Sequence, residues 1–186
     1  SNAQNGCQAA ATVDVLQDAA VPQVDAGMGG TLNCLEPQLS LSGTFVSSGN
    51  TVFQWSTTTG NFSGGVNTLA PQVDAPGWYY LSAENLDNDC ISTDSVFVDQ
   101  NIVIPQINLA APGPITCLSP SEILSAPGSS QGPDFAYNWS TVGGNINGNP
   151  NGLFVEADEA GIYYLTITNL SNGCFVLDSV EVVADT

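Results

Sequence analysis

The chain has 186 residues with 18 Asp and Glu and no Lys, Arg or His, so its formal net charge at pH 7 is −18. Without cationic side chains it cannot neutralise phosphates, which excludes nucleic acid and electrostatic contact with anionic lipids. Hydrophobic residues make up 42% of the chain, which argues against disorder, and no apolar run is long enough for direct membrane insertion.

The first segments of the chain lie outside the main repeats. Residues 1–3, Ser-Asn-Ala, are interpreted as a cloning remnant. In residues 4–20, Asn5-Gly6-Cys7 precedes a Thr-Val-Asp-Val run, as Asn172-Gly173-Cys174 precedes Ser-Val-Glu-Val. We therefore expect residues 4–20 to be the terminal strand of a preceding, truncated repeat, with Cys7 unpaired or forming a bridge between two molecules.

Residues 21–100 are repeated in residues 101–186 with a period of 83 to 84. The matching positions include Cys34 and Cys117, Trp55 and Trp139, Tyr79-Tyr80-Leu81 and Tyr163-Tyr164-Leu165, Cys90 and Cys174, and Asp94-Ser95-Val96 and Asp178-Ser179-Val180. A period of this length suits a complete small domain. The sequence therefore predicts two tandem domains, joined by a short, semi-rigid linker around residues 99–103.

Each repeat shows the alternation of a half-buried β-strand. In residues 51–56, Phe53 and Trp55 fall on one face, and in residues 161–168 the inward set is Tyr163, Leu165 and Ile167. Clusters of Gly, Asn and Ser between these runs are typical of turns. About seven short strands per repeat predict an all-β chain of two β-sandwiches.

The cysteines add to this prediction. In each repeat two cysteines enclose the repeated tryptophan, an order that resembles the immunoglobulin arrangement, although the second cysteine here falls in a turn. The chain has no Cys-x-x-Cys motif and no His or Lys to activate a thiolate. We therefore predict one disulfide in each domain, Cys34–Cys90 and Cys117–Cys174, and an oxidising compartment.

Several motifs together resemble a known family. They are Thr116-Cys117, Trp139-Ser140-Thr141, Gly161-Ile162-Tyr163-Tyr164-Leu165, Asn172-Gly173-Cys174 and Asp178-Ser179-Val180, with counterparts in the first repeat. The pattern resembles the PKD-like or Ig-like tandem repeats of secreted, cell-surface proteins of Bacteroidetes, such as adhesins and gliding-associated proteins. The resemblance implies two immunoglobulin/PKD-like β-sandwiches and extracellular or cell-surface localisation. It also implies O-glycosylation at Ser95 and Ser179, which lie in Asp-Ser-apolar motifs.

The same resemblance implies a non-catalytic structural or adhesive module of a large secreted or cell-surface bacterial protein. The expected partners are further repeats of the parent chain and a surface glycan or another cell-surface protein. The alternative function is a carbohydrate-binding accessory module of a secreted polysaccharide-degrading enzyme. An enzyme is not expected, because His and Lys are absent and the close carboxylates, Asp158-Glu159 and Asp87 with Asp89, sit in turn-like segments.

Two ligand sites are candidates, and no organic cofactor is expected. Asp87 and Asp89, and Asp99 with Asn101 near the linker, offer oxygen ligands for Ca²⁺; the alternative is a solvated Asx turn, because the second repeat has Ser171 and Gly173 where the first has Asp87 and Asp89.

The second candidate is an aromatic platform. Trp78 and Tyr80 alternate outward on one strand and are candidates for stacking on a sugar ring. The alternatives are packing under a loop or against the neighbouring domain. The counterpart of Trp78 in the second repeat is Ile162.

Overall fold

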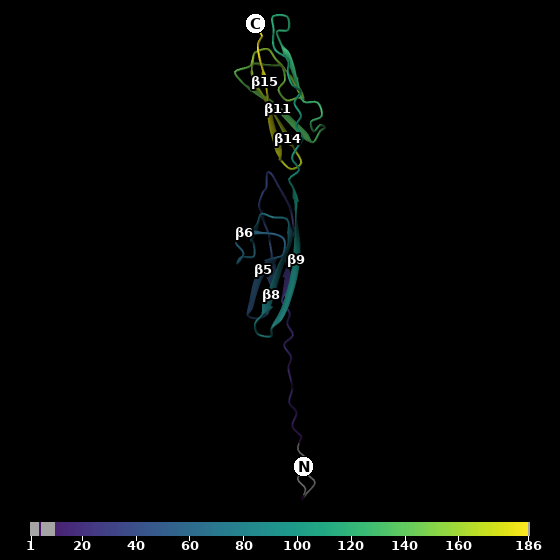
Figure 1. The fold of residues 1–186 in the computed structure, drawn as a ribbon. Coiled ribbons are helices and arrows are strands. Elements are labelled where there is room, and N and C mark those ends of the chain that lie inside the picture. The colour runs from purple at the N-terminus through teal and green to yellow at the C-terminus, as the bar shows by residue number, and fades with distance from the viewer. Residues whose placement is uncertain (1–3, 5–9, 186) are drawn as a thin grey trace.

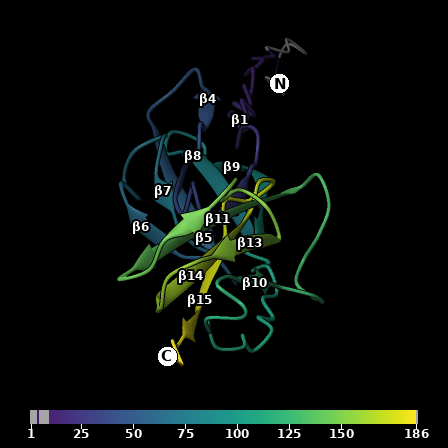
Figure 2. The same cartoon turned by 90° about the horizontal axis from the view of Figure 1, so that it is seen from above.

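The computed structural model describes residue 4 and residues 10–185 of the chain. Two β-sandwich units are stacked end to end, with the N-terminal segment leading away from one end of the rod and the C-terminus at the other (Figure 1). Seen down the long axis in Figure 2, the strands of the second unit lie over those of the first. Within the described residues, no helix is long and apolar enough to cross a membrane.

The first unit consists of two main layers and a ribbon. One layer has the strand order β2-β9-β8-β5 and the other the order β3-β7-β6, while β1 pairs with β4. The bounds are β1 Gln23–Asp25, β2 Thr31–Asn33, β3 Leu39–Ser40, β4 Thr44–Val46, β5 Thr51–Thr57, β6 Phe62–Gly64, β7 Gln72–Val73, β8 Gly77–Asn85 and β9 Cys90–Asn101.

The second unit repeats this plan with the layers β11-β14-β15 and β10-β13-β12. Its strands are β10 Glu122–Ser125, β11 Phe135–Val142, β12 Ile146–Asn147, β13 Phe154–Ala157, β14 Gly161–Asn169 and β15 Phe175–Val182. A parallel bridge between Ile115 and Ala184 takes the place of the β2–β9 pairing in the first unit.

The strand pairing identifies both units as immunoglobulin-like. All main strand pairs are antiparallel except the edge pair β2–β9, which is parallel. Tyr79 and Tyr163 each donate a hydroxyl hydrogen bond to a carbonyl four residues upstream, at 2.6 Å. This is the tyrosine corner of immunoglobulin sandwiches. The prediction of two all-β, immunoglobulin-like sandwiches is confirmed.

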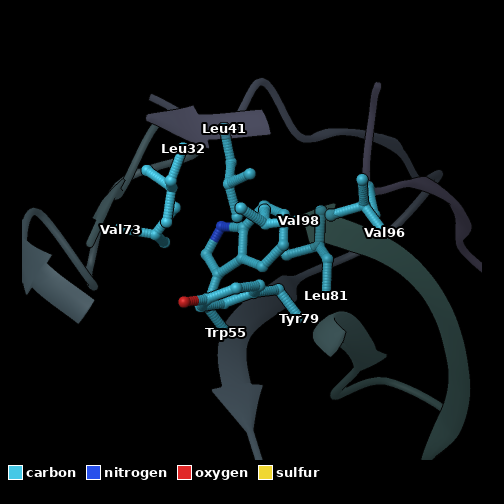
Figure 3. Close-up of a cluster of buried hydrophobic side chains, with 9 residues drawn as sticks. Leu32, Leu41, Trp55, Val73, Tyr79, Leu81, Val96 and Val98 are labelled. Atoms are coloured by element: carbon cyan, nitrogen blue, oxygen red, sulfur yellow. The ribbon is translucent and has the colours of Figure 1, made fainter. Parts of the chain in front are cut away.

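The alternating residues form the two cores. Tyr79, Leu81 and Ala83 on β8 are at most 1% exposed, and Tyr163, Leu165 and Ile167 on β14 are fully buried. Figure 3 shows the indole ring of Trp55 surrounded by apolar side chains of both layers. The ones labelled around it are Leu32, Leu41, Val73, Tyr79, Leu81, Val96 and Val98.

The predicted disulfides are wrong, because each pair of cysteines lies at opposite ends of its sandwich. Cys34 follows β2, whose last residue Asn33 is paired with Asn101 at the end of β9, whereas Cys90 begins β9. The 12 residues of β9 span roughly 36 Å at about 3.3 Å per residue, and a disulfide needs Cα atoms about 5–6 Å apart. Cys117 and Cys174 are likewise separated by the length of β15.

The N-terminal segment also differs from expectation. The structure assigns no strand to residues 10–22, so the terminal strand expected in residues 4–20 is absent from the described part of that segment. The counterpart β15 is held by eight register positions along β14, and within the described part of the chain residues 10–22 have no partner strand of this kind. Cys7 lies outside the described residues.

Candidate functional site: the junction between the two units

A disulfide joins the two units. Cys34 of the first unit is bonded to Cys174 of the second, with Cα atoms 5.0 Å apart and 140 residues between them in sequence. Cys34 lies directly after β2 and Cys174 directly before β15, so the bond connects the facing ends of the two sandwiches. The Cys34 backbone N–H also donates to the Asn172 carbonyl at 3.0 Å.

The turn before β15 holds the linker through buried amide side chains. Asn172 is 1% exposed, and its Nδ2 donates to Asn101 Oδ1 at 2.9 Å and to the Val103 carbonyl at 3.0 Å. Its Oδ1 accepts from the Cys174 N–H at 2.9 Å. Both polar atoms of this buried amide are therefore satisfied, which fixes the position of the linker beside the disulfide.

A close contact between Leu35 and Gly173 completes the junction. Gly173 has φ +70°, and a Cβ atom at this position would lie 2.1 Å from Leu35 Cγ. Only a residue without a side chain allows Leu35 to pack here. The junction thus includes the peptide linker, the Cys34–Cys174 disulfide, these hydrogen bonds and the Leu35–Gly173 contact.

The expected aromatic platform lies on the outer face of the β2-β9-β8-β5 layer. Trp78 is 47% exposed and Phe97 45% exposed, and their rings pack at a centroid distance of 5.2 Å across the β8–β9 pair. Tyr80 is half-buried on the same face, opposite Ser95. In the second unit the Trp78–Phe97 pair is replaced by Ile162 and Glu181.

The candidate calcium ligands do not converge. Asp87 and Asp89 lie in the turn before β9, whereas Asp99 and Asn101 lie at its far end. Asp87 Oδ2 accepts a hydrogen bond from the Asn50 N–H at 2.9 Å, and Asn101 Oδ1 accepts one from Asn172 Nδ2 at the junction. The described residues contain no group of three or more His, Cys, Asp or Glu suited to a metal ion. Calcium binding stays a prediction without a formed site.

The two serines of the Asp-Ser-Val motifs are both solvent-exposed in mid-strand positions. Ser95 lies on β9 opposite Tyr80, and Ser179 lies on β15 opposite Tyr164. Their exposure leaves both hydroxyl groups accessible from the outer face of each sandwich. O-glycosylation of these serines stays a prediction.

Sequence reasoning missed two features of the structure. The buried amides of the junction were detectable as repeated asparagines, Asn85 with Asn169 and Asn88 with Asn172, in both turns. A groove of about 300 Å³ on the second unit, with Ile123 and Phe154 among its lining residues, left no signal, because short strands of two to four residues show little periodicity.

Comparisons with known proteins give distant likenesses to tandem immunoglobulin domains. No protein-family model matches the chain. No curated protein sequence matches it either. Among solved structures, it is similar to the I-band fragment I67–I69 of titin, with 12% identity over 90% of this chain and a TM-score of 0.46. The chain spans 66% of the length of that fragment.

Two further similar structures come from other multidomain proteins. Extracellular domains 3–5 of Drosophila OTK match at 14% identity over 89% of this chain and 62% of that chain, with a TM-score of 0.41. Immunoglobulin domains 1–4 of Sidekick-1 match at 12% identity over 93% of this chain and 51% of that chain, with a TM-score of 0.43. The fold is assigned from the strand order and the tyrosine corners of the chain itself.

Proposed function

We propose that this chain is a non-catalytic, structural and adhesive repeat of a large secreted or cell-surface bacterial protein, in which it serves as a stiff spacer. The observation that carries the proposal is the disulfide between the units, Cys34–Cys174. A spacer has to keep its length and direction under load, and a covalent bond across the junction supplies that property.

The physical effect of this bond is to remove bending freedom. With the peptide linker as its sole covalent connection, the junction could pivot; the disulfide adds a second connection at the facing ends. In the chain-entropy model, closing a loop of 140 residues lowers the free energy of the folded state relative to the unfolded state by about 5 kcal/mol. The bond also supports an oxidising, extracellular location.

Small-angle X-ray scattering of the whole chain tests the spacer role. The intact chain should scatter as a two-unit rod, and Cys34→Ser should give a broader distribution of interatomic distances, because the units can then bend relative to each other. Cys117→Ser is the matched control, since Cys117 is an exposed free thiol. Scattering of Cys34→Ser that is indistinguishable from the control would contradict a stiffening role for the disulfide.

The exposed aromatic pair supports a second candidate function, carbohydrate binding by the first unit. Trp78 and Phe97 form an apolar surface beside the hydroxyl groups of Tyr80 and Ser95, and sugar rings stack on such surfaces. On a glycan array, the intact chain should bind a defined set of glycans and Trp78→Ala should lose them. Ile162→Ala, at the matching position of the second unit, is the control. Equal binding by all three proteins, or by none, would contradict this function.

A further inference from the structure

The two free cysteines of the described residues occupy the same positions as the two bonded ones. Cys90 corresponds to Cys174 and Cys117 corresponds to Cys34. Each unit therefore has one cysteine at each end, and at the observed junction the first cysteine of one unit is bonded to the second cysteine of the next. Cys90 and Cys117 lie at the two outer ends of the pair of units.

We propose that Cys90 and Cys117 each form the same disulfide with an adjacent copy of the repeat, so that every junction of a longer array is covalently locked. This inference rests on the proposed role as a repeat within a longer protein. Cys117 would be bonded to the counterpart of Cys174 in the following copy. Cys90 would be bonded to the counterpart of Cys34 in the preceding copy.

The N-terminal segment supplies a second observation. It is hydrogen-bonded to the turn before Cys90 in the same way as the linker is hydrogen-bonded to the turn before Cys174. Asn85 Nδ2 and Asn88 Nδ2 donate to the Ala20 carbonyl at 3.3 and 3.1 Å. The corresponding amides, Asn169 and Asn172, donate to the Val103 carbonyl at 3.5 and 3.0 Å. Ala20 is 83 residues before Val103, so one linker position is bound in the same way at both turns.

The outer end that carries Cys117 also resembles the corresponding side of the observed junction. The backbone N–H of Thr116 donates to the Ser119 carbonyl at 2.9 Å, as that of Asn33 donates to the Glu36 carbonyl at 3.0 Å, so the same backbone hydrogen bond closes the loops around Cys117 and Cys34. Leu118, the counterpart of Leu35, is 97% exposed. It is an apolar side chain in the position that contacts the glycine of a following unit at the observed junction.

One residue distinguishes the two outer ends. The counterpart of Gly173 in the Cys90 turn is Asp89, which has φ 57° and a side chain. A leucine placed as Leu35 is placed at the observed junction would meet the Asp89 Cβ atom. The copy that precedes this chain must therefore present a smaller or differently oriented residue after its cysteine, whereas the following copy can repeat the Leu–Gly contact.

The bond forms by thiol–disulfide exchange. Two thiols lose two protons and two electrons as the sulfur–sulfur bond forms, and a disulfide oxidant such as oxidised glutathione is reduced to two thiols. Both outer cysteines are accessible, since Cys117 is exposed and Cys90 is partly exposed.

An extended chain tests the proposal. A second copy of residues 103–186 is appended directly after Thr186, which corresponds to Ile102, so that the new junction has the register of the observed one. After refolding in a glutathione buffer, peptide mapping without reduction should recover Cys117 bonded to the appended copy of Cys174. Thiol titration should count the same number of thiols as in the original chain. Replacing Cys174 by Ser in the appended copy is the control and should leave Cys117 free.

Two results would overturn the proposal. The first is a disulfide between the two appended cysteines within their own unit. The second is a thiol count two higher than that of the original chain, with hydrogen exchange showing that the appended unit is folded. In the second case an extended scattering profile of three aligned units would leave the spacer role intact, so that the failures of the two proposals are distinguishable. If the appended unit does not fold, air oxidation of a Leu118→Ala variant of the original chain provides the second measurement, because the smaller side chain removes the clash with Asp89. Peptides that join Cys117 of one molecule to Cys90 of another are expected from this variant, and their absence would count against the pairing.

Discussion

At the residue scale, the two tryptophans of the cores differ in one hydrogen bond. Trp139 Nε1 donates to the Gly152 carbonyl at 3.0 Å, whereas Trp55 Nε1 is buried and has no hydrogen-bond partner among the described residues. Both indoles are 2% exposed and occupy matching positions. The pair therefore isolates the contribution of one buried hydrogen bond against a common background.

We predict that Trp139→Phe lowers the free energy of unfolding of its unit by about 1 kcal/mol more than Trp55→Phe does. Both changes remove similar apolar area, but Trp139→Phe also leaves the Gly152 carbonyl without its partner. Denaturant titrations monitored by hydrogen exchange of peptides from each core measure the two units separately. A larger loss for Trp55→Phe would contradict this explanation.

The tyrosine corner gives a prediction about pH. Burial raises the pKa of Tyr79 above its ordinary value of 10.0, opposed by hydrogen bonds from its surroundings. Because the folded state holds the proton more tightly than the unfolded state, stability is fully present below about pH 10 and falls as the pH rises further toward the folded-state pKa. Tyr79→Phe should weaken this fall, although it costs stability at neutral pH by removing the 2.6 Å bond to the Ala75 carbonyl. Thermal melts between roughly pH 9 and pH 11 measure this decrease. If the melting temperature falls with pH as steeply in the variant as in the original chain, the explanation is wrong.

At the scale of the elements, the long strands were predictable and the cysteine pairing was not. The alternation around Tyr79 and Tyr163 identified β8 and β14 because each buries every second side chain over nine residues. β2 has three residues, which is too short for the sequence to show that it runs parallel to β9. The parallel direction of β2 places Cys34 at the opposite end of the sandwich from Cys90. The partner of Cys34 is therefore set by how the two units stack, which short strand patterns do not reveal.

The contact between the turn and the neighbouring unit gives a prediction for Gly173→Ala. The variant should melt at a lower temperature than Gly143→Ala, because both glycines have a similar positive φ, 70° and 79°, but only Gly173 faces Leu35. Both variants have the cost of a left-handed conformation, about 1 kcal/mol, and Gly173→Ala has the clash in addition. Combining it with Leu35→Ala should recover the difference. Equal melting temperatures for the two single variants would contradict the contact.

At the scale of the whole molecule, charge and the disulfide have opposite effects on the stability of the folded state: the disulfide raises it and the charge lowers it. The 18 carboxylates have no cationic side chain to pair with, so their repulsion opposes the compact state. We predict that the melting temperature rises as NaCl is added, because salt screens this repulsion. Differential scanning calorimetry from low to moderate ionic strength measures the trend. A flat or falling melting temperature would show that the repulsion is unimportant.

The most direct test of the junction is a peptide map of the intact, unreduced chain, with thiols alkylated before digestion. A peptide that joins Cys34 to Cys174, with Cys90 and Cys117 both alkylated, is the expected result. Peptides that join Cys34 to Cys90 and Cys117 to Cys174 would contradict the covalent lock between the units.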